Sequence, residues 1–288
     1  MKRTVSTPKM FRTLLVVTLA VLVFACSFSC EVSSKPAVDA SSPSVQSTSV
    51  PAMEEVVVHG ACPAGMLNVK GDFCLQVEQV CAEWADEDKS PGANSGIGPL
   101  RCARFSSSKC VSKVRKRLDY CMDRYEWPNK KGELPPVGMT WHDAKASCES
   151  VGKRLCTAQE WTFACEGEDV KPYLYGDGMK RDNTACNIDK PSMDPSTPKS
   201  EWPKHYRAVP SGSMEHCVSW AGVHDMLGNV DEWVLNEGGR SNGDPYFSAL
   251  KGGYWSKVRT RCRPMTTVHG PGFSFYQIGF RCCRDAKL

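Results

Sequence analysis

The chain has 288 residues, a formal net charge of +4 and 16 cysteines. Four basic residues before Thr13 account for the whole charge excess, so the rest of the chain is neutral and gives no electrostatic argument for nucleic acid or an acidic membrane as a partner. The sequence contains no Cys-x-x-Cys, and no two histidines have the i, i+4 spacing that would place both on one helical face. The cysteines are therefore predicted to form disulfides and not a metal or redox site.

Residues 1–25 have the features of a signal peptide. Basic residues precede an uncharged apolar run, Thr13 to Ala25, that is too short to cross a bilayer as a helix. Val23 and Ala25 precede Cys26 as in a bacterial lipoprotein cleavage site, and they also suit ordinary signal-peptide cleavage. Lipidation at Cys26 is the favoured prediction, and free secretion is the alternative. Both predict an exported protein, periplasmic or on the cell surface, and with lipidation it contacts a membrane only through the N-terminal lipid.

Residues 26–57 are rich in Ser, Pro, Val and Thr, a composition that cannot bury enough apolar surface to fold. They are predicted to form a flexible tether, followed by a folded domain at residues 58–288. Residues 62–74 alternate apolar and polar side chains and reach a Lys-Gly-Asp sequence, which predicts the start of a hairpin with its turn there.

Residues 75–118 interrupt the pattern with a loop-like composition. We interpret them as a cysteine-rich insertion, held in place by Cys81, Cys102 and Cys110.

Two helices are signalled next. Thr140 with Asp143 forms a capping-box pattern, and apolar residues recur at helical spacing until Gly152. Thr157 with Glu160 repeats the start signal, and Gly167 ends the second helix. No further helix is predicted beyond Gly167, where short apolar stretches alternate with turns. The pattern indicates a loop-rich α+β domain.

Five strings occur in a fixed order along the second half of the chain. They are Gly152-Lys-Arg-Leu-Cys-Thr-Ala-Gln-Glu-Trp-Thr-Phe-Ala-Cys-Glu-Gly167, Tyr173-Leu-Tyr-Gly176, Ala221-Gly-Val-His-Asp-Met-Leu-Gly-Asn-Val-Asp-Glu-Trp-Val234, Lys251-Gly-Gly-Tyr-Trp255 and Ile278-Gly-Phe-Arg-Cys282. In order and spacing they closely resemble the formylglycine-generating enzyme (sulfatase-modifying factor) family. Asp123-Arg-Tyr-Glu-Trp-Pro-Asn129 and Pro136-Val-Gly-Met-Thr-Trp-His-Asp-Ala144 match its N-terminal part.

The resemblance implies an irregular, C-type-lectin-like α+β fold that is loop-rich and stapled by disulfides. Trp161, Trp233 and Trp255 are then core residues. Function does not follow from fold, however. Enzymes of the family oxidise a cysteine in a C-x-P-x-R sequence to formylglycine, with copper held by two cysteines just after the Gly-Gly-Ser, because soft Cu(I) prefers two soft sulfurs.

The corresponding segment here, Tyr254 to Arg261, contains no cysteine. Cys262 aligns in two ways. Direct counting puts it on the second copper cysteine with Lys257 in place of the first, whereas a loop deletion puts it on a structural cysteine that bridges to the helix end at Cys165. Either alignment leaves the copper pair incomplete, so copper is not expected, and Cys262 is catalytic only if the family chemistry survives.

The resemblance also implies a calcium site. Asn187 and Ile188, together with Asn229 and Glu232, match regions where family members ligate calcium through hard oxygen ligands. The alternative is that Asn229 takes a left-handed turn conformation and Glu232 caps or pairs locally. Both interpretations stay open.

Disulfides Cys148–Cys282 and Cys165–Cys262 follow from the resemblance, each tying a helix to a C-terminal strand. Cys156 with Cys283 and Cys186 with Cys217 are further hypotheses. The six cysteines of the N-terminal arm keep all their connectivities open.

Three functions are therefore considered. The first is a binding or scaffold module, without the copper site, for an unidentified protein, peptide or glycan. The second is an active oxidoreductase of the family, and the third is a lectin-like carbohydrate binder.

Overall fold

The computed structural model describes residues 62–85, 101–194, 196–239 and 247–287. They belong to one compact unit, Glu55–Leu288, and the expected signal peptide, tether and lipidated Cys26 lie outside the described residues. Within the described ranges no helix is long and apolar enough to cross a membrane.

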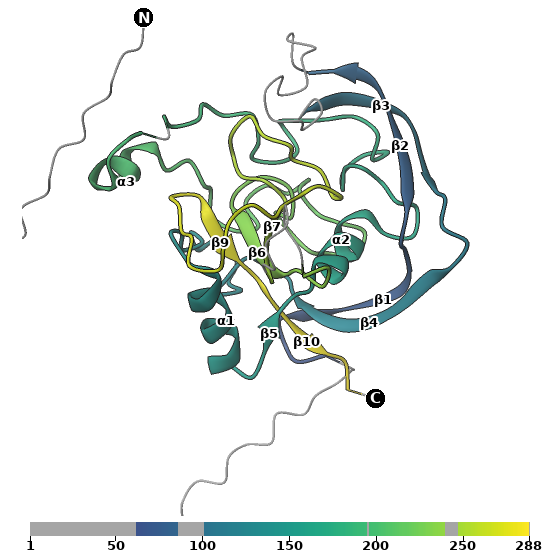
Figure 1. The fold of residues 1–288 in the computed structure, drawn as a ribbon, viewed down its shortest axis with the longest axis horizontal. Helices are drawn as coiled ribbons and strands as arrows, with labels where there is room; N and C mark the ends of the chain where they lie inside the picture. Colours follow the sequence, from purple (N-terminus) through teal and green to yellow (C-terminus); the bar gives the residue numbers. More distant parts are fainter. Residues whose placement is uncertain (1–61, 86–100, 195, 240–246, 288) are drawn as a thin grey trace, which may run out of the picture. The chain divides into compact units, whose positions relative to one another are not determined.

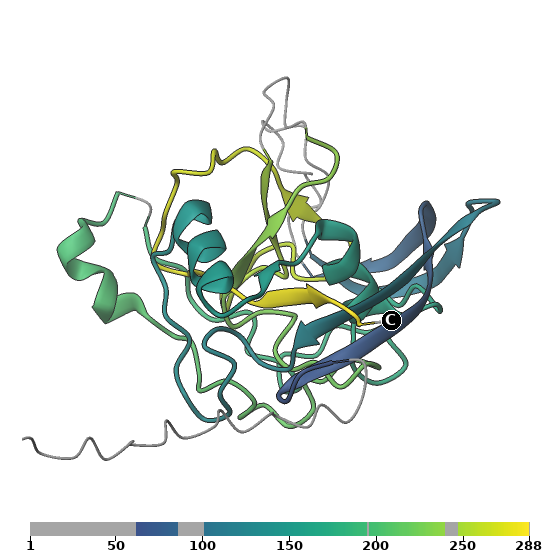
Figure 2. The ribbon, with the colours of Figure 1, turned by 90° about the horizontal axis from the view of Figure 1, so that it is seen from below.

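Strands form three sheets (Figures 1 and 2). One contains, in spatial order, β1 (Met66–Cys74), β4 (Arg115–Asp123), β10 (Cys282–Asp285) and β5 (Arg154–Leu155). Another contains β8 (Met265–Thr266), β7 (Ser248–Lys251), β6 (Asp231–Leu235) and β9 (Ile278–Phe280). The third is a two-stranded ribbon of β2 (Val77–Trp84) and β3 (Cys102–Cys110).

Both predicted helices are present. Helix α1 (Trp141–Ser150) begins after a capping box at Thr140, and α2 (Ala158–Glu166) begins after one at Thr157 and ends at Gly167. Each capping box works because the Thr hydroxyl and the acidic residue three positions later satisfy backbone N–H groups that the first turn leaves free. A third helical segment was not predicted: a 3-10 turn, η1 (Lys199–Glu201), leads into the four-residue α3 (Trp202–His205).

The predicted turn at Lys-Gly-Asp is wrong. Lys70, Gly71 and Asp72 lie inside β1, which runs on to Cys74 and pairs along its whole length with β4. The glycine has another cause, since a Cβ at Gly71 would lie 2.6 Å from the Glu168 carboxylate and 2.7 Å from the Phe163 ring. It permits close packing of the strand and not a reversal.

The cysteine-rich insertion is more regular than its composition indicated. Strands β2 and β3 pair as an antiparallel ribbon with irregular register near Cys81. The disulfides of the arm are Cys62–Cys121, Cys74–Cys110 and Cys81–Cys102. Cys81–Cys102 links the two strands of the ribbon, and Cys74–Cys110 joins the end of β3 to the end of β1, so a two-stranded element that would be marginal alone is fastened both to itself and to the neighbouring strand.

All 14 described cysteines are disulfide-bonded. Cys148–Cys282 and Cys165–Cys262 are the pairs that the resemblance implied, and Cys156–Cys283 and Cys186–Cys217 are the two further hypotheses. The core tryptophans Trp161, Trp233 and Trp255 are all 0% exposed, as expected.

A buried ionic group lies at the centre of the domain. The Arg281 guanidinium donates to both Glu232 oxygens, at 2.7 and 2.6 Å, and the Trp161 indole N–H donates to the same carboxylate at 2.8 Å. Two further buried carboxylates lie nearby. Glu126 accepts from Ser211 Oγ at 2.6 Å, and Asp225 accepts from a backbone N–H at 2.6 Å. One cation therefore faces three acids.

Two of these acids have raised pKa values, mainly because they are buried. Burial, together with repulsion from Asp225, holds the pKa of Glu126 well above its ordinary range. Burial, opposed by the backbone N–H of Gly212 and by Arg281, raises the pKa of Asp225 from 3.8 to about 6. The folded protein therefore binds a proton at Asp225 more tightly than the unfolded chain does.

Asp225→Asn tests this linkage. A folded pKa above the unfolded one gives stability that is complete below about pH 4 and is lost as the pH rises through about 6. The gap between 3.8 and about 6 is worth about 3 kcal/mol. Urea unfolding should show that the stability of Asp225→Asn relative to the unsubstituted protein rises by about 3 kcal/mol between about pH 4 and pH 7. The exposed control Asp169→Asn should show no such rise, and a flat difference for Asp225→Asn would contradict the linkage.

Candidate functional site

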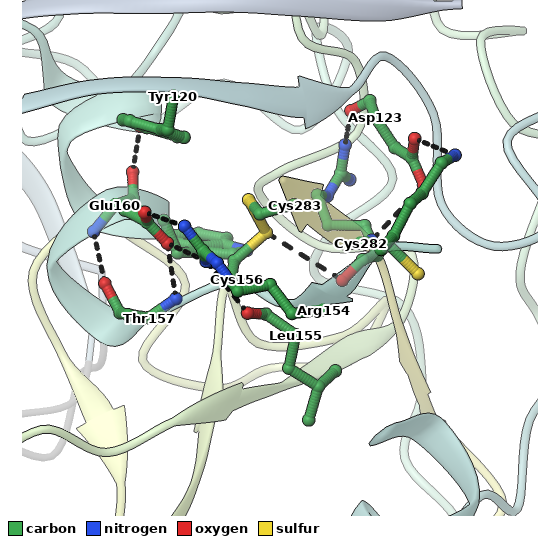
Figure 3. Close-up of a disulfide and its surroundings, with 12 residues drawn as sticks. Tyr120, Asp123, Arg154, Leu155, Cys156, Thr157, Glu160, Cys282 and Cys283 are labelled. Carbon is green, nitrogen blue, oxygen red and sulfur yellow. Dashed lines mark hydrogen bonds and ion pairs between the residues drawn. A yellow bond between two sulfur atoms is a disulfide. The ribbon is translucent and has the colours of Figure 1, made fainter. Parts of the chain in front are cut away.

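The string from Gly152 to Gly167 builds structure. Arg154 donates to both carboxylate oxygens of Glu160, at 2.8 and 2.7 Å, and also to Asp285 at 2.6 Å. The disulfide Cys156–Cys283 lies beside this pair (Figure 3). The bidentate pair and the disulfide together fasten β5 and the start of α2 to β10. Arg154, Cys156 and Glu160 of this string therefore hold structural elements together (Figure 3). This structural role explains these residues without assigning them a part in catalysis.

Lys251 of the Lys-Gly-Gly string is fully enclosed. It is 1% exposed, and its Nζ donates to the backbone carbonyls of Cys262 at 2.7 Å and Arg263 at 2.9 Å. The Nζ also lies 5.0 Å from the Trp161 ring centroid. Burial lowers the pKa of Lys251 to about 7. This side chain anchors the backbone around Cys262, and it faces no open surface from which it could act on a ligand.

The two glycines after Lys251 let the chain approach its neighbours closely. Gly252 has φ +86°, and a Cβ there would lie 2.5 Å from the Met226 carbonyl oxygen. Gly253 has φ +71°, and a Cβ there would lie 2.8 Å from Thr260 Oγ1. Both are backbone positions that favour glycine. The chain after Gly253 thus folds back and places Thr260 against Gly253.

Cys262 ends this folded-back segment and is not a free thiol. It is 0% exposed and forms a disulfide with Cys165 at the end of α2, with a sulfur separation of 2.03 Å. Of the two alignments, the structure matches the loop deletion, which gives Cys262 its structural partner. No cysteine lies between Tyr254 and Arg261. A disulfide supplies no thiolate, so these residues do not fit Cu(I).

The segment is partly buried as well as free of thiols: Tyr254, Val258, Arg259 and Arg261 are half-buried. Ser256 and Thr260 are each 1% exposed. Their hydroxyls, and the indole N–H of Trp255, have no hydrogen-bond partner among the described residues. Only Lys257 in the middle of the segment is exposed. The polar side-chain atoms of the segment are oxygen and nitrogen, which are harder metal ligands than the cysteine sulfurs of the family enzymes.

The expected calcium ligands come together only in part. The Asn187 side-chain amide donates to Asn229 Oδ1 at 3.0 Å, and the Asn229 backbone N–H donates to the Asn187 carbonyl at 3.0 Å. Ile188 is fully buried beside them. Glu232 is occupied by Arg281 and Trp161, and the described residues contain no group of three His, Cys, Asp or Glu side chains placed to hold a metal.

Protein donors already use Asn229 Oδ1 and the Glu232 carboxylate, so these two groups do not fit calcium as arranged, whereas calcium at the Asn187 and Ile188 oxygens stays a prediction. Asn229 has φ +53°, the left-handed conformation of the alternative interpretation. Its side chain bridges three segments, since the amide also donates to Glu126 at 2.9 Å and to the Val209 carbonyl at 3.1 Å. Asn229 is thus a connector in the core. Glu232 pairs with Arg281, 49 residues away in the sequence, so the expectation that it caps or pairs locally is wrong.

Sequence reasoning missed Glu126, Asp225 and Arg281 as a group. All three stand in strings that carry the resemblance, so the positions were visible but their meeting was not. Arg281 lies more than fifty residues beyond Asp225 in the sequence, and only the fold brings both side chains to Glu232, where the Arg281 charge opposes the effect of burial on the pKa of Asp225. No local pattern in the sequence signals this meeting.

Known proteins resemble this chain over part of their length. Inactive C-alpha-formylglycine-generating enzyme 2 of Bos taurus is 29% identical over 163 residues, which are 54% of this chain and 52% of that protein. Formylglycine-generating enzyme of Streptomyces coelicolor is 29% identical over 175 residues, 54% of each. The chain thus spans about half the length of these curated relatives. The solved structure titled "Crystal Structure of CarF" has a TM-score of 0.49 at 16% identity, covering 78% of this chain and 99% of that one.

A family model described as "Sulfatase-modifying factor enzyme 1-like domain" matches residues 79–286, well over half of the chain. The match begins within the segment interpreted as an insertion, at β2. The motif residues, the disulfides and the short elements joined by long loops agree with this assignment. The chain belongs to the sulfatase-modifying factor family, and its fold is the irregular, C-type-lectin-like α+β fold expected from the resemblance.

Proposed function

We propose that this protein is a non-catalytic binding module of the formylglycine-generating enzyme family. The observation that carries the proposal is the disulfide between Cys165 and Cys262, which takes up the only cysteine near the position of the family's copper pair. The Tyr254–Arg261 segment adds no second sulfur. Two thiolates are what Cu(I) requires, and neither is available. A relative whose name marks it as inactive supports the same reading.

The proposal includes export. The apolar run before Cys26 and the disulfide use throughout the described domain both support an oxidising compartment. We place the protein in the periplasm or on the cell surface, held by a lipid on Cys26 and connected through residues 26–57. Its partner is an exported protein, peptide or glycan and not nucleic acid, because the chain after Arg12 carries no net charge.

The direct test is an oxidation assay. The purified full chain is incubated in air with copper and a peptide containing C-x-P-x-R, and the aldehyde is measured by peptide mass and hydrazide trapping. We expect no aldehyde above the level given by a Cys165→Ser/Cys262→Ser double variant, in which both sulfurs are removed together. The enzyme from Streptomyces coelicolor, run in parallel, shows that the assay works. Aldehyde formed by the unsubstituted chain and lost in the double variant would overturn the proposal.

A further inference from the structure

Two hollows lie on either side of Trp202. Trp202 begins α3, which lies at the end of the domain opposite the β2–β3 ribbon (Figures 1 and 2). The first encloses about 530 Å³ and the second about 590 Å³. Lys199 and Trp202 line both. We call the pair the Trp202 groove. Its walls are residues 134–138 on one side and the aromatic rings of Tyr206, Phe275 and Tyr276 on the other.

Aromatic rings build the groove. The Trp202 indole packs edge-on against Phe275, with ring centroids 4.9 Å apart, and lies 6.2 Å from Tyr276. Tyr206 and Tyr276 rest in turn on the buried Trp255. The rings support one another, so the groove is formed before any ligand arrives. Apolar hollows with preformed aromatic walls are typical binding sites.

The opposite wall is a stretch of irregular backbone, residues 134–137, that bends at Gly138, where φ is +78°. Pro135 and Pro136 fix their own φ angles, and no helix or strand includes residues 134–138. The backbone N–H groups of Val137 and Gly138 donate to no described residue. Leu134 at the rim is 53% exposed. A free backbone N–H beside an apolar hollow offers a peptide one main-chain hydrogen bond next to a pocket for a side chain.

One cation lines the groove. Lys199 is the only charged residue among the described lining residues of the two hollows, whereas Lys204 and Arg207 line neither. Glu201, an acid close to Lys199 in sequence, lies 3.7 Å from Lys204. Lys199 forms no ion pair with any described residue, and its Nζ lies 5.4 Å from the Trp202 ring centroid. A ligand with a carboxylate would give Lys199 the partner that the described part of the chain does not.

A sugar fits the groove less well than a peptide. The Tyr206 hydroxyl already donates to the Pro135 carbonyl at 2.7 Å, and the Trp202 indole N–H points to the Thr197 carbonyl at 3.4 Å. Few polar groups remain to pair with sugar hydroxyls, and burying unpaired hydroxyls is costly. An apolar or proline side chain meets no such cost.

We propose that the Trp202 groove binds an extended, acidic segment of a protein partner. An apolar or proline side chain enters the hollow between Trp202 and Pro136, a backbone carbonyl of the segment accepts from the Val137 N–H, and an Asp or Glu reaches Lys199. This rests on the proposed binding function and names its ligand class. The site lies apart from the Tyr254–Arg261 segment, where the family enzymes hold copper.

The test is a selection from a phage-displayed library of random linear peptides, panned on the full chain. We expect enrichment of peptides that combine Asp or Glu with proline or large apolar residues. In fluorescence anisotropy, Trp202→Ala should weaken the enriched peptide about ten-fold. Lys199→Glu should weaken it roughly five-fold at low salt and less at high salt.

Matched controls separate the groove from general effects. Lys204→Glu makes the same charge change on α3 outside both hollows and should leave affinity nearly unchanged, and circular dichroism should show that all variants are folded. No enrichment over a Trp202→Ala bait, enrichment that Trp202→Ala does not reduce, or oligosaccharide binding on a glycan array that Trp202→Ala abolishes would each overturn the peptide proposal. Enrichment of C-x-P-x-R peptides that ignores Trp202→Ala would instead count against the non-catalytic function as well.

Discussion

The disulfide between Cys165 and Cys262 joins the end of α2 to the segment that follows β7. Its two cysteines are 97 residues apart in the sequence, so the disulfide joins distant parts of the chain. Lys251 supports the same point from inside by binding the carbonyls of Cys262 and Arg263. The backbone around Cys262 is thereby held by a covalent bond and by hydrogen bonds to a buried amine. A sulfur used in this way serves the fold and is withdrawn from metal chemistry.

The rest of the centre is built around Arg281 and Glu232. Their bidentate pair is buried, and removing one partner would leave an unpaired charge inside the domain. Trp161 of α2 and Asn229 before β6 attach to this pair or to the neighbouring Glu126. These are motif residues of the family. Their retention is explained by packing and charge, which is why the motifs identify the fold without establishing the reaction.

Much of the fold was predictable because its signals are local. Capping boxes at Thr140 and Thr157 need only residues three positions apart, and both helices begin as predicted. The turn expected at Gly71 failed because a glycine that permits close packing looks the same in sequence as one that permits a turn. The ribbon of β2 and β3 was read as loop because its charged, serine-rich composition conceals a pairing that disulfides stabilise.

The candidate site was harder to predict from the sequence because its contacts are between distant residues. Position relative to the family motifs identified Cys262 and its partner Cys165, a long-range contact that no local pattern reveals. The Trp202 groove had no such guide, since Pro136, Trp202 and Tyr276 are separated by scores of residues and meet only in the fold. Asn187, Ile188 and Asn229 lie together as predicted from the motifs, but the contacts that hold the Glu232 carboxylate and the Asn229 amide come from Arg281 and Glu126 in other segments.

The account depends most directly on the state of one sulfur. The full chain is unfolded in denaturant with an alkylating reagent and no reductant, digested, and mapped by mass spectrometry. The account predicts a cross-linked peptide joining Cys165 to Cys262 and no alkylated Cys262. Alkylation of Cys262 in the majority of molecules would show a free thiol beside the Tyr254–Arg261 segment and would contradict the non-catalytic reading.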